Sequence, residues 1–214
     1  HYLSRVIRVS STGGGGGGGD SGGSSDSSSG EESVISTFTP TCVTALPTDS
    51  SRFIVGSTGG ELAMVDIETG KTIWRRHVTN GATTGASTAA SVPDMSKLVY
   101  KCVIHGSLPL IATGCEDGKI RFHDMNGQLV NSGHNVLGHS DAVSALDFSP
   151  CGQYLMSGGY DCSLRIWDIH SRNCVQEIPT HRRKYSEGIH DVAYHATKSL
   201  VATCGADSLA KIYQ

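Results

Sequence analysis

Features that mark several classes of protein are missing from this sequence. It has no N-x-S/T acceptor site for glycans, no apolar run long enough to cross a membrane and no signal peptide. Its formal charge is only −3, and the acidic side chains within residues 10–33 account for that excess. The rest of the chain is close to neutral, which gives no electrostatic reason to expect nucleic acid or an anionic membrane as a partner.

Cysteine is present, but its spacing matches neither a zinc site nor a disulfide framework. The seven cysteines are odd in number and none belongs to a C-x-x-C motif; they are residues 42, 102, 115, 151, 162, 174 and 204. This pattern favours reduced thiols and predicts neither a bound metal nor a cofactor. We expect a cytoplasmic protein whose association with membranes, where there is any, is made through its partners. The first residue is His1 rather than Met, which predicts a fragment of a longer protein.

The most regular part of the chain is residues 138–169, GHSDAVSALDFSPCGQYLMSGGYDCSLRIWDI, which opens with Gly-His and closes with Trp-Asp. The run 143–148 alternates apolar and polar residues, as a strand with one buried face does. Two further runs of strand type follow, at 154–159 and 163–169, and the turn residues between the runs include Pro and Gly. The unit therefore predicts three antiparallel strands of one sheet.

This unit resembles the WD repeat, which forms one blade of a β-propeller. The resemblance assigns four residues to the family's structural tetrad, a hydrogen-bonded chain across the blade: His139, Ser157, Asp161 and Trp167. Their chemistry fits that role, because a buried indole N–H needs an acceptor and an imidazole can join a hydroxyl to a carboxylate. The tetrad positions of the last repeat are occupied by His181, Thr203, Asp207 and Tyr213.

The combination of Ser, His and Asp also suggests a hydrolase. A nucleophilic serine needs an exposed hydroxyl and an oxyanion hole, and Ser157 instead lies in the middle of the strand LMSGG, without a G-x-S-x-G elbow. We therefore predict a structural role and no enzyme activity, and keep a propeller hydrolase as the alternative. His123 takes the Trp position of the preceding repeat and has no partner at metal-ligand spacing, so it is interpreted as an aromatic substitute.

The whole chain is expected to be all-β, a partial WD-repeat β-propeller of about four four-stranded antiparallel blades. In order, we expect a candidate strand of an upstream blade at 1–10, a disordered Gly/Ser linker at 11–33, a WD-like blade at 34–76, a flexible insertion at 77–97, a WD-like blade at 98–137, a WD blade at 138–179 and a C-terminal WD blade at 180–214. In the linker, Ser28 and Ser29 each precede a Glu by three positions, which suits an acidophilic kinase, although a plain solvated linker is the simpler interpretation.

The last two repeats are also similar to the final blades of striatins, and the stretch VIHGSLPLIATGCEDGKIRFHD is similar to the blade before them. The resemblance covers about 43–75 and 98–214. It implies a non-catalytic scaffold that brings protein phosphatase 2A subunits together with germinal-centre-type kinases and a Mob-family protein. Calmodulin binding would belong to a striatin region that this chain does not contain. The alternative is another WD-repeat adaptor, such as a ubiquitin-ligase substrate receptor.

Turn residues are the expected partner contacts of such a scaffold. We single out Glu116, Asp141, Tyr160, Arg182, Arg183, Lys184 and Tyr185. The last four form the one compact basic patch with an adjacent aromatic residue, for which a solvated loop is the simpler alternative.

Overall fold

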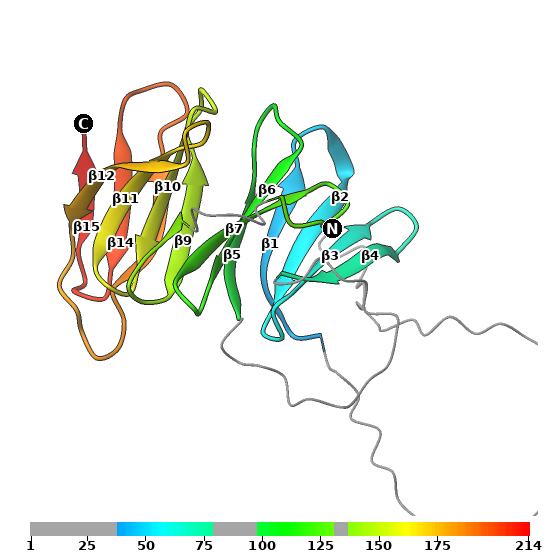
Figure 1. Ribbon diagram of the computed structural model, residues 1–214, viewed down its shortest axis with the longest axis horizontal. Helices are drawn as coiled ribbons and strands as arrows, with labels where there is room; N and C mark the ends of the chain where they lie inside the picture. The colour runs from blue at the N-terminus through cyan, green and yellow to red at the C-terminus, as the bar shows by residue number, and fades with distance from the viewer. Residues whose placement is uncertain (1–37, 79–97, 131–136) are drawn as a thin grey trace, which may run out of the picture.

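The computed structural model describes residues 38–78, 98–130 and 137–214, and the regular elements within these ranges are all β-strands (Figure 1). The strand expected at 1–10, the linker at 11–33 with Ser28 and Ser29, and residues 79–97 of the expected insertion lie outside the described residues. His77 ends a strand and Val78 is buried.

The strands form four antiparallel sheets, in each of which the strands are adjacent in chain order. The first sheet contains β1 (Pro40–Leu46), β2 (Asp49–Ser57), β3 (Glu61–Asp66) and β4 (Lys71–His77). The second contains β5 (Val99–Ile104), β6 (Leu110–Cys115), β7 (Lys119–Asp124) and β8 (Leu137–Gly138). The third contains β9 (Val143–Phe148), β10 (Tyr154–Gly159), β11 (Ser163–Asp168) and β12 (Asn173–Pro179), and the fourth β13 (Ile189–Tyr194), β14 (Val201–Gly205) and β15 (Ala210–Tyr213).

The sheets follow one another as the blades of a propeller. Figure 1 shows them in succession from β1–β4 at one side to β13–β15 at the other. The first strands of neighbouring sheets lie against each other, β1 on β5, β5 on β9 and β9 on β13. The all-β blade architecture is thus confirmed. The fourth sheet has three described strands, and Gly138 pairs with Lys119 in the second sheet rather than in the blade expected at 138–179.

Apolar side chains are buried between the blades rather than within them. Three clusters alternate with the sheets, and each draws its members from two neighbouring blades. Between the first and second blades, for example, Ile54 and Leu62 pack with Val99 and Ile111, all of them fully buried. Because a sheet between two neighbours is covered on both faces, β9 buries five of its six residues, and the single buried face expected for 143–148 is wrong.

The turn between the second and third strands has the same construction in every blade. One residue in it has a positive φ: Gly60, Gly118, Cys162 or Ser208. In three blades an Asp side chain accepts the N–H two residues further on: Asp117 from Lys119 at 3.2 Å, Asp161 from Ser163 at 3.1 Å and Asp207 from Leu209 at 3.2 Å. This local turn explains why the Asp position is retained even where the rest of the tetrad varies.

Bulges recur at fixed positions in the blades. Each first strand carries one extra residue near its start: Thr41, Tyr100, Ser144 or His190. Two outer strands are also bulged, β4 at Ile73 and β12 at Val175, and both side chains are exposed. A bulge redirects a side chain without ending the strand. The side chains at these positions therefore do not follow the alternation between the two faces of the sheet that their neighbours show.

A glycine lies at an equivalent close contact between neighbouring blades. It is the penultimate residue of the second strand, and it faces the first strand of the next blade: Gly56 faces Val99, Gly114 faces Val143 and Gly158 faces Ile189. A Cβ on Gly114 would lie 2.8 Å from Cγ1 and 2.9 Å from the carbonyl oxygen of Val143. The corresponding residue of the fourth blade is Cys204, which is exposed.

We predict that Gly114→Ala lowers the free energy of unfolding by about 1–3 kcal/mol, because the added methyl group must push a strand backbone away. Urea unfolding followed by circular dichroism measures the change. Cys204→Ala is the matched control at the same blade position, and we expect it to stay within about 0.5 kcal/mol of the wild type. Equal stabilities for the two variants would contradict the blade contact described here.

Candidate functional site

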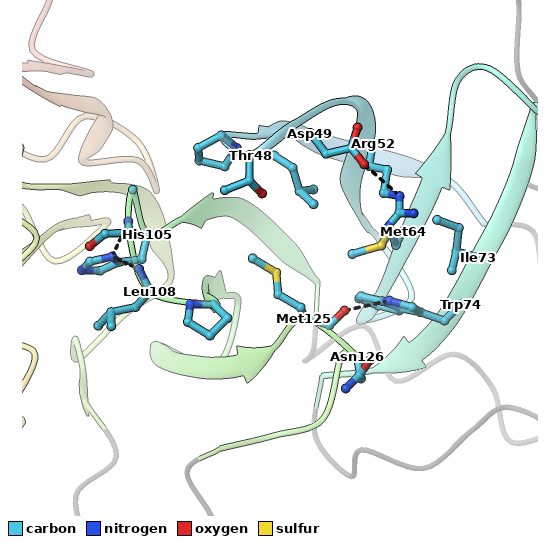
Figure 2. A pocket seen from close by; sticks show the side chains of 15 residues that line it. Thr48, Asp49, Arg52, Met64, Ile73, Trp74, His105, Leu108, Met125 and Asn126 are labelled. Carbon is cyan, nitrogen blue, oxygen red and sulfur yellow. Dashed lines mark hydrogen bonds and ion pairs between the residues drawn. The ribbon is translucent and has the colours of Figure 1, made fainter.

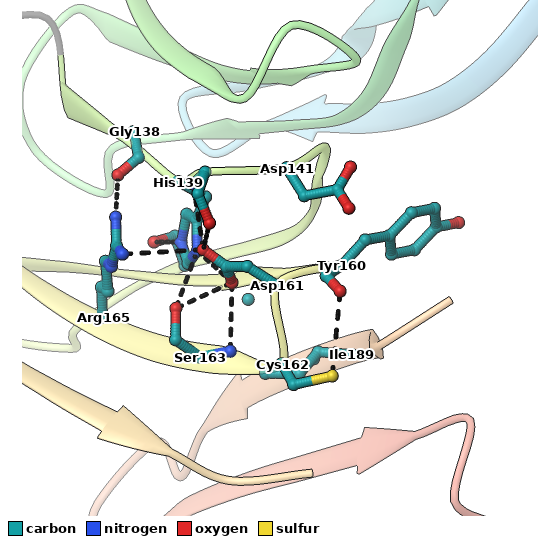
Figure 3. A network of polar contacts seen from close by, with 12 residues as sticks. Gly138, His139, Asp141, Tyr160, Asp161, Cys162, Ser163, Arg165 and Ile189 are labelled. Atoms are coloured by element: carbon teal, nitrogen blue, oxygen red, sulfur yellow. Dashed lines mark hydrogen bonds and ion pairs between the residues drawn. The ribbon is translucent and has the colours of Figure 1, made fainter. Parts of the chain in front are cut away.

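The polar network of the third blade joins four elements. Trp167 Nε1 on β11 donates a hydrogen bond to Ser157 Oγ on β10, 2.7 Å away. Ser157 Oγ lies 2.6 Å from His139 Nε2, and His139 Nδ1 lies 2.9 Å from Asp161 Oδ1 in the turn (Figure 3). Since the indole can only donate and the carboxylate can only accept, each hydrogen points from Trp167 toward Asp161.

The network holds its carboxylate in the ionised form. Burial is the largest single effect on Asp161 and would raise its pKa, but the hydrogen bonds from His139 and Ser163 together outweigh it and hold that pKa well below its usual range. Asp161 also accepts the backbone N–H of Ser140 at 3.0 Å. The loop before β9 is therefore tied to the turn between β10 and β11. Ser157 is fully buried and already bonded on both sides, so its hydroxyl is not placed to attack a substrate.

The fourth blade repeats two of the three tetrad contacts. His181 Nδ1 lies 2.8 Å from Asp207 Oδ1 and His181 Nε2 lies 2.9 Å from Thr203 Oγ1. Burial is the largest single effect on Asp207 and would raise its pKa, but the hydrogen bonds from His181 and from the backbone N–H groups of Arg182 and Leu209 together lower it to about 2. Tyr213 packs against the apolar cluster between the third and fourth blades, and the structure gives it no hydrogen bond to Thr203 within residues 137–214. Tyr213 therefore fills the Trp position as an apolar ring only.

The first two blades depart further from the pattern. In the second blade His123 Nε2 lies 3.3 Å from Thr113 Oγ1, while its buried Nδ1 has no hydrogen-bond partner. Burial, with a smaller contribution from Arg121, lowers the pKa of His123 to about 4. In the first blade, Glu61 is buried and accepts a hydrogen bond from Arg75 Nε at 2.8 Å.

The turns and loops at the tetrad end of the blades form one face, which we call the loop face: Tyr100, Glu116, Asp141, Tyr160 and the loop 182–187. The bulge in β5 places Tyr100 at the centre of the loop face. In β1 and β9 the bulged hydroxyls of Thr41 and Ser144 donate to the first strand of the next blade. The bulge of β5 instead carries Tyr100, whose ring reaches the ring of Tyr160 in the next blade, with centroids 5.6 Å apart at 61°.

Acidic side chains surround these two rings. Burial raises the pKa of Tyr100, and Glu116 and Tyr160 beside it add to the effect. Burial and the nearby charge of Glu187 also raise the pKa of Tyr160. In Figure 3 the ring of Tyr160 and the carboxylate of Asp141 both point away from the His139–Asp161 network. The sequence-predicted contacts Glu116, Asp141 and Tyr160 thus lie on the same face.

The basic loop is anchored at its start. The backbone N–H of Arg182 donates to Asp207 Oδ2 at 3.2 Å, and the Arg183 guanidinium forms an ion pair with Asp141. Backbone hydrogen bonds of 3.2 Å in both directions between Lys184 and Glu187 close a tight turn. Tyr185 lies in this turn with φ of 57° and is 92% exposed. Arg183 and Asp141, predicted as separate contacts, therefore bind each other, whereas Tyr185 projects.

Comparison with known proteins decides the family. The model of the WD domain, G-beta repeat, matches residues 91–124, 130–168 and 172–214, more than half of the chain. The chain belongs to the WD-repeat family. Among WD-repeat proteins it is 36% identical to striatin of Rattus norvegicus over 175 residues, 81% of this chain and 21% of that protein. Identity to striatin-3 and striatin-4 of Mus musculus is 36% and 37%, with the same 81% of the chain covered and 20% and 21% of those proteins.

The described blades are therefore a striatin-family WD-repeat region, and the chain spans about a fifth of the length of these relatives. Solved WD-repeat structures agree on the fold. The RRP9 WD40 repeats match with a TM-score of 0.64 at 16% identity over 82% of this chain and 51% of that chain. U3-55K matches with a TM-score of 0.63 at 17% identity over 82% of this chain and 52% of that chain.

At the other end of the WD-repeat blades, an open cleft of about 450 Å³ lies between the first two blades (Figure 2). Its wall is largely apolar and includes Met64, Trp74 and Met125. The polar groups there serve local structure: Trp74 Nε1 donates to the carbonyl of Met125 at 3.0 Å, and Asp49 pairs with Arg52 at 3.1 Å. Nothing in the cleft forms a catalytic arrangement.

The described part of the chain contains neither a metal-binding cluster nor a membrane-spanning helix. No group of three or more His, Cys, Asp or Glu side chains there is arranged to hold a metal ion. No helix there has the length and apolar character needed to cross a membrane.

Sequence reasoning missed two members of the loop face, Tyr100 and Glu187. Tyr100 lies in a predicted strand, and only the bulge explains why it points toward the next blade. Glu187 follows the basic patch, and its proximity to Tyr160 depends on how the loop turns back. No spacing signal in the sequence indicates either contact.

We predict that Trp167→Phe lowers the free energy of unfolding by about 2 kcal/mol, because it removes the indole N–H from a buried hydroxyl and leaves a cavity. Tyr213→Phe, at the same position of the fourth blade, removes a hydroxyl without a tetrad contact and should cost less than about 0.5 kcal/mol. Both are measured by urea unfolding. A larger loss for Tyr213→Phe than for Trp167→Phe would contradict the assignment of the hydrogen bonds.

We also predict a pH dependence that belongs to His123. Its folded-state pKa of about 4 lies below the ordinary 6.5, so the unfolded chain takes up the proton first as the pH falls. The stability that the neutral ring contributes is present above pH 6.5 and is lost between pH 6.5 and 4, by about 2 kcal/mol at pH 4.5. The Asp161 and Asp207 contributions are lost only below about pH 4, because their folded-state pKa values are lowered from 3.8.

The measurement compares the wild type with His123→Phe by urea unfolding at pH 7.5 and pH 4.5. The wild type should lose about 2 kcal/mol more than the variant. Equal losses would show that His123 is not held neutral in the fold.

Proposed function

We propose that this chain is a non-catalytic protein-interaction module of a striatin-like scaffold, whose loop face binds a partner within a phosphatase 2A and kinase signalling complex. The observation that carries the proposal is the grouping of Tyr100, Tyr160, Asp141 and the anchored loop 182–187 from three blades on one face. The similarity to striatins supports the choice of complex. We place the chain in the cytoplasm, where its thiols stay reduced.

The physical character of the loop face suits recognition of a protein. Tyr and Arg are among the residues that most often dominate binding energy, and Tyr brings a large contact area at a small cost in side-chain entropy. Tyr185 projects from a turn whose backbone is closed by hydrogen bonds, so its ring is presented before the partner arrives. Preorganisation of this kind reduces the entropy lost on binding.

The partners we propose are phosphatase 2A subunits, germinal-centre-type kinases and a Mob-family protein. The mixed charges of the face set its specificity: Glu116 and Glu187 lie near the tyrosine pair, while Lys184 lies 6.0 Å from the ring of Tyr185. A partner surface with both a basic and an acidic patch beside an aromatic pocket would match this pattern. Calmodulin, if it binds the scaffold, does so outside these blades.

The decisive variant is Tyr185→Asn, because Asn tolerates the positive φ and Tyr185 contributes little to the core. We expect at least about a tenfold loss of phosphatase 2A subunit capture, the effect of removing one strong contact residue. The chain is immobilised, incubated with cell lysate and probed for phosphatase 2A subunits by immunoblot.

Val175→Asn is the matched control, because Val175 is 59% exposed on β12, outside the loop face. It should capture phosphatase 2A as well as the wild type does. Equal capture by Tyr185→Asn and Val175→Asn would remove the basic loop from the interface. Absence of phosphatase 2A from the wild-type capture would overturn the proposed complex.

A further inference from the structure

Two cysteine side chains meet between the first and second blades. Cys42 lies on β1 and Cys102 on β5, the first strands of neighbouring blades, and their sulfur atoms are 3.4 Å apart. All seven cysteines of the chain lie in its described part, where each is a free thiol. Within that part this is the thiol–thiol contact that the structure records.

The surroundings hold the two thiols in this position. Cys42 pairs in register with Gly56, and a Cβ at Gly56 would lie only 2.7 Å from Cys42 Sγ, so the glycine leaves room for the sulfur. Cys102 is 2% exposed and packs in the apolar cluster with Ile54 and Val99. A disulfide needs sulfurs about 2.05 Å apart, so the side chains must close by little more than an ångström.

The two thiols differ in reactivity. Cys42 is the more accessible of the pair, and its hydrogen bond with Cys102 lowers its pKa against the opposing effect of burial. That same contact, together with burial, raises the pKa of Cys102. The thiolate is the nucleophile, so Cys42 is the thiol that reacts first with an oxidant, and Cys102 is placed to react second.

We propose that Cys42 and Cys102 form a disulfide between the blades when the protein meets hydrogen peroxide. The Cys42 thiolate attacks one peroxide oxygen, breaks the O–O bond and becomes a sulfenic acid; the departing hydroxide takes up a proton as water. The sulfur of Cys102 then attacks the Cys42 sulfur, loses its proton and displaces the hydroxyl group as a second water. The two thiols lose two electrons and hydrogen peroxide gains them.

A small oxidant fits this site better than a bulky one. Cys42 lies at the edge of the apolar cluster and is only partly exposed. Hydrogen peroxide can therefore reach its sulfur more easily than a larger oxidant such as oxidised glutathione can. The bond would join residues 60 positions apart and fix the first blade to the second. The first two blades would then be held together by a covalent bond as well as by apolar packing.

The test uses the full chain, reduced and then treated with a few equivalents of hydrogen peroxide before alkylation. Trypsin cleaves at Lys101 and Lys119 and so leaves Cys102 and Cys115 on one peptide. The mass-spectrometric measurement is therefore made on Cys115→Ala. We expect a peptide pair linked through Cys42 and Cys102 that a thiol reductant separates, and in the wild type the loss of two of the seven free thiols.

Two variants test the order of the steps. Cys102→Ser should leave the sulfenic acid on Cys42, where dimedone captures it. Cys42→Ser should give at least about a tenfold lower yield of dimedone product at Cys102, because that thiol is buried and its pKa is raised.

The proposal is overturned by oxidation of the exposed Cys151, Cys174 or Cys204 without any 42–102 link. It is equally overturned by a dimedone product on Cys102 in Cys42→Ser that matches the product on Cys42 in Cys102→Ser. Circular dichroism of each variant establishes that it is folded, and the wild-type thiol count shows whether two thiols are lost without any substitution.

Discussion

Close contact between the second strand of one blade and the first strand of the next is the constraint on which this structure depends. The apolar clusters lie between blades, so a single blade buries one face only when its neighbour is present. Glycine at the contact lets the two backbones approach, and in the third and fourth blades the tetrad networks then tie the incoming loop to the turn of the same blade. Stability and the position of the loop face therefore come from the same packing.

Much of the fold could be predicted from the sequence because strands, turns and the tetrad are local patterns. The strands of the third blade begin and end within one residue of the predicted runs, since the alternation of apolar residues and the Pro and Gly breakers act over a few positions. The contact of Tyr100 with Tyr160, the Asp141–Arg183 ion pair and the Cys42–Cys102 pair could not be predicted. Each joins residues of different blades, and their meeting depends on bulges and on blade packing.

Variation among the four tetrad positions shows which parts of the network each blade retains. The acidic turn residue is kept in three blades because it also organises the turn itself. The ring position accepts Trp, Tyr or His with different numbers of hydrogen bonds, because packing of an aromatic face contributes even without a polar link. The positions of the tetrad could therefore be predicted from the sequence, whereas the number of hydrogen bonds formed in each blade is known only from the structure.

The bulges in the outer strands have a consequence for solubility. In the described sheets β4 and β12 are outer strands, and the backbone groups at the edge of a sheet are where another extended chain can pair. At Ile73 and Val175 an extra residue interrupts the regular spacing of those groups. A foreign strand can then form only a few consecutive hydrogen bonds before it loses register, which discourages fibrillar aggregation of the folded blades even though both positions expose an apolar side chain.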